Sequence, residues 1–455
     1  MKLDVKKILL TVIIVLVFLF SFYRVVHYTI LFSEQSIQMD FTAYYTAGKT
    51  VNNDLSPYVN YIFTRWDLWD GVSTFKHSRF LYPPLVANLF QPIATLPYIE
   101  AKYIWNFFNL FCFLICIVLL GFISFRNDKS ERYKKTNKIL IAGILAFNFF
   151  PFIALLERGQ IDCVTLLFIL IGFSFLLKKE KNEFISGVFF GVATLFKLYS
   201  ILLIPFFFIQ KKYKVIYGYF TGIFILAVLT LFISGKNLSY DYLTKEAPRI
   251  AKYGSSGNKE MRLPAWILQA YFPMTPTSIS ILDGRMYLTE SISFNSKASF
   301  IRLLEVSLPE TLSNSVFSLI VFLFFFVLIF YFKRKYPLEE NKYNFIFWQV
   351  ILIIITLSGP FTWVMNLVWL TPVIFVMIQI LPDLFKNKNY ILIVIFIVGY
   401  LLLSLPDNLL LTKNIKFIGE FFKSRYVISE LSIFIILMIY LKMHRTAKNR
   451  FIANK

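Results

Sequence analysis

The sequence contains few of the residues that build metal centres, with three cysteines and three histidines in 455 residues. The histidines do not cluster, and Cys112, Cys116 and Cys163 lie inside apolar runs without the spacing of a metal site. We interpret these cysteines as small buried hydrophobic residues. The glycine patterns of phosphate-binding loops and dinucleotide folds are also missing. The sequence therefore predicts no metal and no cofactor.

Acidic residues are scarce as well, with 26 Asp and Glu against 47 Lys and Arg, which gives a net charge of +21. The basic residues concentrate in short loops between apolar runs, where they set membrane topology, so we expect no nucleic acid as a partner. Hydrophobic residues make up 57% of the chain, and several apolar runs reach the ~17–25 residues that cross a bilayer as a helix. The expected fold class is an all-α polytopic membrane protein.

The basic loops predict a topology. If these loops and both termini are cytoplasmic, the number of crossings is even, and about twelve transmembrane helices satisfy the rule. Two large outer loops remain, 27–100 and 235–312, within a single membrane domain over 1–455. The expected spans are 8–26, 101–124, 139–156, 161–177, 184–196, 198–209, 215–234, 314–332, 343–358, 363–381, 390–405 and 427–443.

Asp40 follows the first expected span and would lie near the outer surface of the membrane. Helical spacing places Tyr44 on the same face, and Tyr45 is its neighbour. A carboxylate at this place can accept a proton in a reaction on a lipid-linked substrate. The alternative is that Asp40 only caps the helix that begins there.

Two cationic positions lie at expected outer turns. Arg158 belongs to the hairpin Glu157–Asp162, which also carries Gln160, and Lys197 lies at the outer turn between two half-length helices. An arginine fork and a buried lysine are both suited to binding a phosphate group. The alternative is that these charges only extend to the lipid headgroups.

Two later segments carry polar or aromatic residues next to expected spans. Arg302 precedes the eighth span, where it either lines a substrate cavity or flanks the helix. Trp363 follows the tight turn at Ser358, and Asn366 is the only strongly polar side chain soon after it. Trp363 either binds substrate or belongs to the interfacial belt of aromatic residues.

Together these residues resemble glycosyltransferase family 87, whose members are multi-span enzymes of the GT-C superfamily that use polyprenyl-phosphate sugars. The sequence departs from the family pattern at Asp162, where Asn is common, at Ser200, where Pro is common, and after Trp363, where histidine is common. The role of that histidine therefore does not transfer to Asn366. The matching pieces, in family order, are Asp40-Phe41, Tyr44-Tyr45, Ala47-Gly48, Pro57-Tyr58, Tyr82-Pro83-Pro84-Leu85, Phe90, Pro92, Leu96-Pro97, Ala101, Trp105, Asn109, Gly159-Gln160, Gly191, Ala193, Phe196-Lys197, Pro205, Ser358, Pro360 and Trp363.

The resemblance implies a GT-C-type bundle that transfers a mannose- or arabinose-like sugar, with inversion, from a polyprenyl-phosphate donor to a cell-envelope glycolipid or glycan. The reaction would take place on the outer face of a bacterial cell membrane, in contact with membrane lipids. A flippase for lipid-linked sugars and an O-antigen-type ligase remain as alternatives. In the implied site, Asp40 is the base, Arg158 and Lys197 bind the donor phosphate, and the residues that bind substrates are Tyr44, Tyr45, Tyr82, Gln160, Asp162, Arg302, Trp363 and Asn366.

Overall fold

The computed structural model describes residues 5–35, 39–59, 61, 65, 68, 80–126, 128, 130–178, 182–248, 296–304, 312–335, 341–360, 362–406 and 416–453. Every regular element in these ranges is helical, and they contain no strand. The all-α fold class expected from the sequence is therefore confirmed for the described part of the chain.

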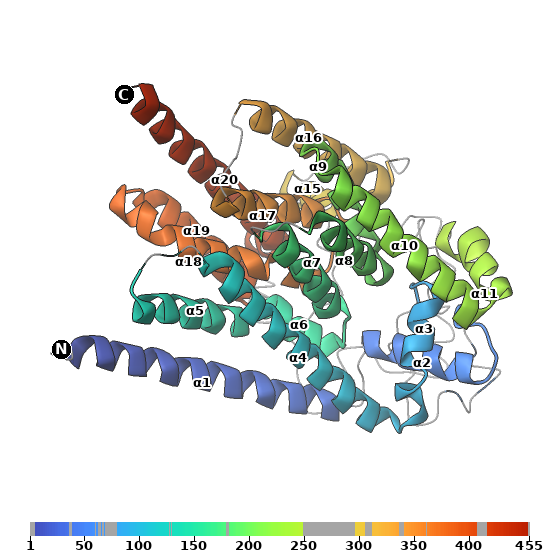
Figure 1. Ribbon diagram of the computed structural model, residues 1–455. Coiled ribbons are helices and arrows are strands. Elements are labelled where there is room, and N and C mark those ends of the chain that lie inside the picture. The colour runs from blue at the N-terminus through green and yellow to red at the C-terminus, as the bar shows by residue number, and fades with distance from the viewer. Residues whose placement is uncertain are drawn as a thin grey trace.

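The first half of the chain forms α1 (Val5–Glu34), α2 (Met39–Asn52), α3 (Pro84–Phe90), η2 (Ile93–Thr95), α4 (Tyr98–Phe125), α5 (Arg132–Phe147), α6 (Phe150–Arg158), α7 (Asp162–Leu176), α8 (Glu183–Phe196), η3 (Leu198–Leu203), α9 (Ile204–Ile209) and α10 (Tyr213–Ser234). The second half forms α11 (Lys236–Asp241), η4 (Tyr242–Glu246), α15 (Ser296–Leu304), α16 (Asn314–Lys335), α17 (Asn341–Leu357), η6 (Val364–Leu370), α18 (Thr371–Lys386), α19 (Tyr390–Ser404) and α20 (Lys416–Ala453). Figure 1 shows one helical bundle with both termini at one end and α2, α3 and α11 at the other.

Among the described residues, six helices are long and apolar enough to cross a membrane, or seven if the bent pair α5 and α6 forms one span. The helix axis bends by 48° between α5 and α6. The expected count of about twelve is not confirmed, although each expected span coincides with a helical segment. Five apolar helices have only 10–17 residues, fewer than the ~20 that a straight crossing needs: Asp162–Leu176, Glu183–Phe196, Leu198–Ile209, Asn344–Leu357 and Tyr390–Ser404.

In the segment expected to form the first outer loop, the described residues lie mainly in helices. α1 continues to Glu34, beyond the expected boundary at residue 26, and α2 follows it. α2 crosses α3 at close range, because a Cβ at Gly48 would lie 2.7 Å from the carbonyl oxygen of Phe90. Glycine permits this approach, which holds the helix that carries Asp40 against α3. In the second outer segment, residues 249–295 lie outside the described residues.

α8 and α10 make close backbone contact, which fixes the end of α8. Gly187 and Gly191 on α8 face α10, where Gly218 and Gly222 face back, and a Cβ at any of the four would collide with backbone atoms of the opposite helix. Small residues four positions apart permit such packing in membranes. α8 ends immediately before Lys197, so this contact also sets the position of that lysine.

Candidate active site

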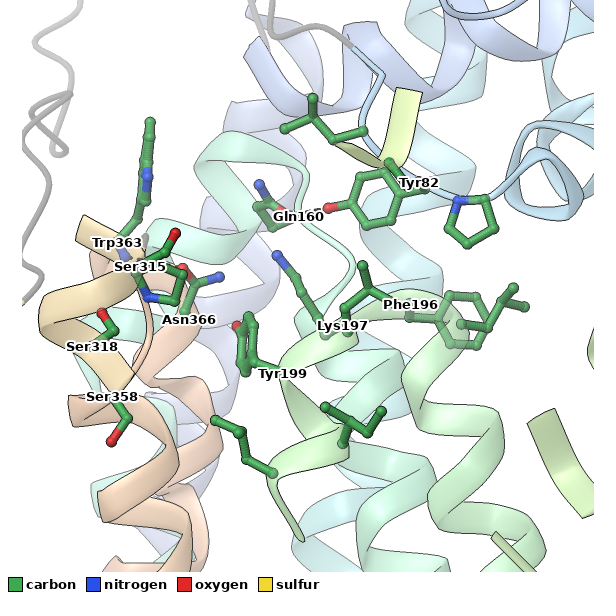
Figure 2. A pocket seen from close by; sticks show the side chains of 18 of the residues that line it. Tyr82, Gln160, Phe196, Lys197, Tyr199, Ser315, Ser318, Ser358, Trp363 and Asn366 are labelled. Atoms are coloured by element: carbon green, nitrogen blue, oxygen red, sulfur yellow. Dashed lines mark hydrogen bonds between the residues drawn. The ribbon is translucent and has the colours of Figure 1, made fainter. Parts of the chain in front are cut away.

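A cavity of about 540 Å³ lies between α2, the loop before α3, η3, α16 and the turn before η6. Figure 2 shows Lys197 and Gln160 in this cavity, with Tyr82 to one side and Trp363 and Asn366 to the other. Segments from the first and last thirds of the chain therefore meet in one space. Its wall contains seven residues that the sequence had singled out: Asp40, Tyr44, Tyr82, Gln160, Lys197, Trp363 and Asn366.

Asp40 and Arg158 form a buried ion pair. Asp40 lies in the first turn of α2, and Arg158 is the last residue of α6. The Arg158 Nε donates to Asp40 Oδ2 at 2.8 Å, and the exposed fractions of the two residues are 4% and 5%. Charges at this depth are tolerated when they are paired. The Arg158 guanidinium also lies 5.8 Å from the centre of the Trp363 ring.

The turn after α6 aims Gln160 into the cavity. Gly159 adopts the left-handed conformation, with φ of 67°, which ends α6 at no steric cost because glycine lacks a Cβ. The Trp105 indole donates to the Gly159 carbonyl at 2.7 Å and anchors the turn. The Tyr44 hydroxyl donates to Gln160 Oε1 at 2.9 Å and lies 2.8 Å from the Tyr82 hydroxyl. Burial raises the pKa of the Tyr82 hydroxyl, which therefore stays protonated at neutral pH.

A second ion pair lies on the other side of this turn. Lys197 interrupts the helical segment between α8 and η3 with an extended backbone, and its Nζ lies 3.1 Å from Asp162 Oδ2. Asp162 is fully buried and also accepts hydrogen bonds from the Tyr199 hydroxyl at 3.3 Å and from Asn366 Nδ2 at 3.1 Å. Lys197, in contrast, lines the cavity. The carboxylate thus holds the ammonium group at the cavity wall.

Asn366 connects η6 to α7. Its Oδ1 accepts a hydrogen bond from the backbone N–H of Trp363 at 3.0 Å, while its Nδ2 donates to Asp162. Both ends of the amide therefore have protein partners, although the side chain also borders the cavity. Asn366 therefore lies next to the ion pair of Lys197 and Asp162, and its amide orients the Asp162 carboxylate.

Four of the residues singled out in the sequence are not among the described residues of the cavity wall. Arg158 and Asp162 lie behind it, each paired with a residue of the wall. Tyr45 donates its hydroxyl hydrogen to the Leu96 carbonyl at 2.7 Å and packs against the ring of Tyr98. Arg302 belongs to α15, but its side chain lies outside the part of the chain that the structure describes.

Sequence reasoning gave no role to several polar residues of the cavity wall, including Tyr199, Ser318 and Ser358. Tyr199 had a signal, since it lies two residues after Lys197, whereas a lone serine such as Ser318 in an apolar helix gives little. No group of three or more His, Cys, Asp or Glu side chains that could hold a metal ion occurs in the described ranges.

The bundle and its cavity define the class, a multi-pass membrane protein with two buried ion pairs beside a partly apolar cavity. The sequence model of glycosyltransferase family 87 matches residues 80–354, more than half of the 455-residue chain. The chain belongs to glycosyltransferase family 87, which confirms the resemblance found in its sequence. The matched region includes Arg158 and Lys197 and begins after Asp40.

Two curated proteins are similar over part of the chain. GPI mannosyltransferase 1 of Candida albicans is 26% identical over 157 residues, which are 34% of this chain and 35% of that protein. GPI mannosyltransferase 1 of Dictyostelium discoideum is 27% identical over 166 residues, which are 36% of this chain and 31% of that protein. The chain thus spans about a third of the length of these relatives. No solved structure shows a significant match.

Proposed function

We propose that the protein is a membrane glycosyltransferase that moves a mannose- or arabinose-like sugar from a polyprenyl-phosphate donor to a hydroxyl group of a cell-envelope glycolipid or glycan. Transfer takes place on the outer face of the membrane and inverts the anomeric carbon. Family membership and the partial similarity to two mannosyltransferases support this proposal. The observation that carries it is that the carboxylate of Asp40 and the ammonium of Lys197 line one cavity.

Asp40 accepts the proton of the acceptor hydroxyl as the oxygen attacks the anomeric carbon. Arg158 fixes the orientation of this carboxylate and compensates its charge in a buried position. Asp40 is the only acidic residue among the described residues that line the cavity, so the described wall offers no second carboxylate to form a covalent sugar intermediate. A single displacement, which inverts the anomeric carbon, fits this arrangement.

Lys197 stabilises the negative charge that grows on the polyprenyl phosphate as it leaves. The sequence interpretation grouped Arg158 with Lys197 as phosphate ligands. We now assign Arg158 to Asp40, because their side chains pair at 2.8 Å and Arg158 is not among the residues of the cavity wall. Lys197 therefore remains the main cation for the donor phosphate.

The cavity continues as an apolar surface toward the lipid. Leu198 and Ile201 of η3 and Leu319 of α16 line the cavity and are also exposed at the protein surface, with exposed fractions of 52%, 45% and 54%. An apolar chain gains free energy by leaving water for such a surface or for the bilayer beside it. A polyprenyl tail in this position would place its phosphate near Lys197.

The proposal is tested by sugar transfer with purified protein in lipid vesicles, supplied with labelled polyprenyl-phosphate sugars and extracted envelope lipids. Asp40→Asn is compared with wild type and with Asp128→Asn, which removes a carboxylate that pairs with Lys138 at 2.7 Å and does not line the cavity. We expect transfer by wild type and by Asp128→Asn, and a loss of about 10²–10⁴-fold for Asp40→Asn, because the acceptor loses its base.

Equal transfer by wild type and Asp40→Asn would show that Asp40 only supports the fold through Arg158. If no donor gives transfer and the labelled lipid crosses the vesicle membrane, the flippase alternative is favoured. Transfer only from diphosphate-linked glycans would favour the ligase.

A further inference from the structure

One wall of the cavity carries serine hydroxyl groups that have no role in the proposed reaction. Ser315 and Ser318 lie one turn apart on α16, and Ser358 directly follows the last residue of α17. Figure 2 shows all three on the side of the cavity that holds Trp363 and Asn366. α16 is otherwise rich in apolar side chains, many of them exposed at the protein surface, so hydroxyl groups at the cavity are unusual for this helix.

Ser358 is buried, with an exposed fraction of 2%, and its hydroxyl has no hydrogen-bond partner among the described residues. Serine and threonine in helices commonly donate to the carbonyl four residues earlier, as Thr230 does to Leu226 here. Other buried polar side chains in the described part of the chain also lack a partner, but of these only Ser358 belongs to the cavity wall. A ligand in the cavity would supply the partner that this hydroxyl lacks.

The backbone around Ser358 is held in place by other groups. The Ser358 N–H donates to the Ile354 carbonyl at 2.9 Å, the Thr362 hydroxyl donates to the Thr356 carbonyl at 2.8 Å, and the Ser296 hydroxyl donates to the Leu357 carbonyl. The end of α17 is thus fixed without use of the Ser358 side chain. Ser318 is also buried, with an exposed fraction of 6%, and lines the same cavity.

We propose that Ser318 and Ser358 form the subsite for the donor sugar and hydrogen-bond its ring hydroxyls, an inference that rests on the proposed function. Ser318 is followed in α16 by Leu319, which belongs to the apolar surface assigned to the polyprenyl tail, and by Phe322, which is buried and also lines the cavity. Ser358 lies on the side of Asn366, whose amide holds the carboxylate that pairs with Lys197. In the donor the phosphate joins the tail to the sugar, so a phosphate at Lys197 brings the sugar to the cavity wall on its other side, away from the tail.

The chemistry of the wall defines what the subsite recognises. Hydroxyl groups donate and accept hydrogen bonds and carry no charge, which suits a neutral sugar rather than a second phosphate. A site that hydrogen-bonds a substrate hydroxyl discriminates against the analogue that lacks it. The two serines would therefore make the site bind a glycosylated polyprenyl phosphate more tightly than polyprenyl phosphate without a sugar.

The test measures binding, so that it does not depend on turnover. Wild type in nanodiscs is titrated with polyprenyl-phosphate mannose, polyprenyl-phosphate arabinose and polyprenyl phosphate without sugar. Ser318→Ala and Ser358→Ala are compared with Ser124→Ala, which removes another buried hydroxyl that has no described partner but lies outside the cavity wall. Because the Ser358 hydroxyl has no partner among the described residues, we expect its replacement by alanine to leave the fold intact.

We expect both cavity variants to bind the preferred sugar lipid about tenfold more weakly and to bind polyprenyl phosphate as wild type does. Ser124→Ala should match wild type with all three lipids. Equal weakening for sugar-bearing and bare lipid, or unchanged binding of the sugar lipid, would overturn the subsite while leaving the proposed function standing. Failure of wild type to bind any of the three lipids would overturn both.

Discussion

At the scale of single residues, the site consists of charges that are buried in pairs. Asp162 is fully buried, and Lys197 compensates its charge at 3.1 Å. A carboxylate at that depth that loses its cation destabilises the protein, whereas replacement of both partners can be nearly neutral. Lys197 therefore stabilises the fold as well as serving the proposed reaction, and the two roles can be measured separately.

We predict that Lys197→Met lowers the free energy of unfolding by about 3–5 kcal/mol, because it leaves the buried Asp162 charge without a cation. The double variant Asp162→Asn with Lys197→Met should regain most of this stability but no sugar transfer, because the phosphate still lacks its cation. Chemical unfolding in detergent, together with the transfer assay, measures both. If the double variant transfers sugar at the wild-type rate, Lys197 has no part in the reaction.

The sequence identified Asp40, Arg158 and Lys197 as chemically special, and the structure brings all three together. Their pairing was not predictable, because Arg158 and Asp40 are 118 positions apart. A charged residue in an apolar stretch of sequence indicates that it needs a partner. The identity of that partner depends on how α2 packs against α6. The sequence alone therefore could not show that the Arg158 side chain pairs with Asp40.

At the scale of helices, the contact between α8 and α10 depends on glycine. We predict that Gly187→Ala destabilises the protein by about 1–3 kcal/mol, because its Cβ would press against the carbonyl of Val215, which cannot move without the helix. The control is Gly121→Ala, whose Cβ would lie 3.3 Å from a side-chain methyl of Ile139. Helix propensity alone favours alanine in both places. Equal thermal stability of the two variants would contradict the close packing.

The positions of most helices could be predicted from apolar runs, but their status as complete crossings could not. The apolar pattern shows where a helix runs, and it does not show where a helix stops inside the bundle. The break at Lys197 and the bend between α5 and α6 arise where polar or proline-containing turns are sheltered by neighbouring helices. Several residues of the candidate site, including Lys197 and Gln160, lie at such breaks between short helices.

At the scale of the whole molecule, the termini lie at one end of the bundle and the short helices α2, α3 and α11 at the other (Figure 1). If the basic loops lie in the cytoplasm, as the sequence predicts, α2 and the cavity lie on the outer side. The orientation predicts which residues a reagent can reach from each side of the membrane.

We predict that Asn53→Cys, at an exposed position after α2, reacts with a membrane-impermeant maleimide added to intact cells. Lys134→Cys, at an exposed position of α5, should react only after the membrane is permeabilised. The parent protein provides the background, since Cys112, Cys116 and Cys163 are buried. The reverse labelling pattern would put the cavity on the cytoplasmic side.

The turn between α6 and α7 makes the geometry of the site independent of the thickness of the bilayer. Arg158, which holds the proposed base, and Asp162, which holds the proposed phosphate cation, belong to one stretch of five consecutive residues. Because these five residues are covalently connected, tilting of the surrounding helices in a thicker or thinner membrane leaves the separation of Arg158 and Asp162 unchanged. A single residue inserted between Arg158 and Asp162 would instead change the separation of the two charges, however well the helices fit their lipid.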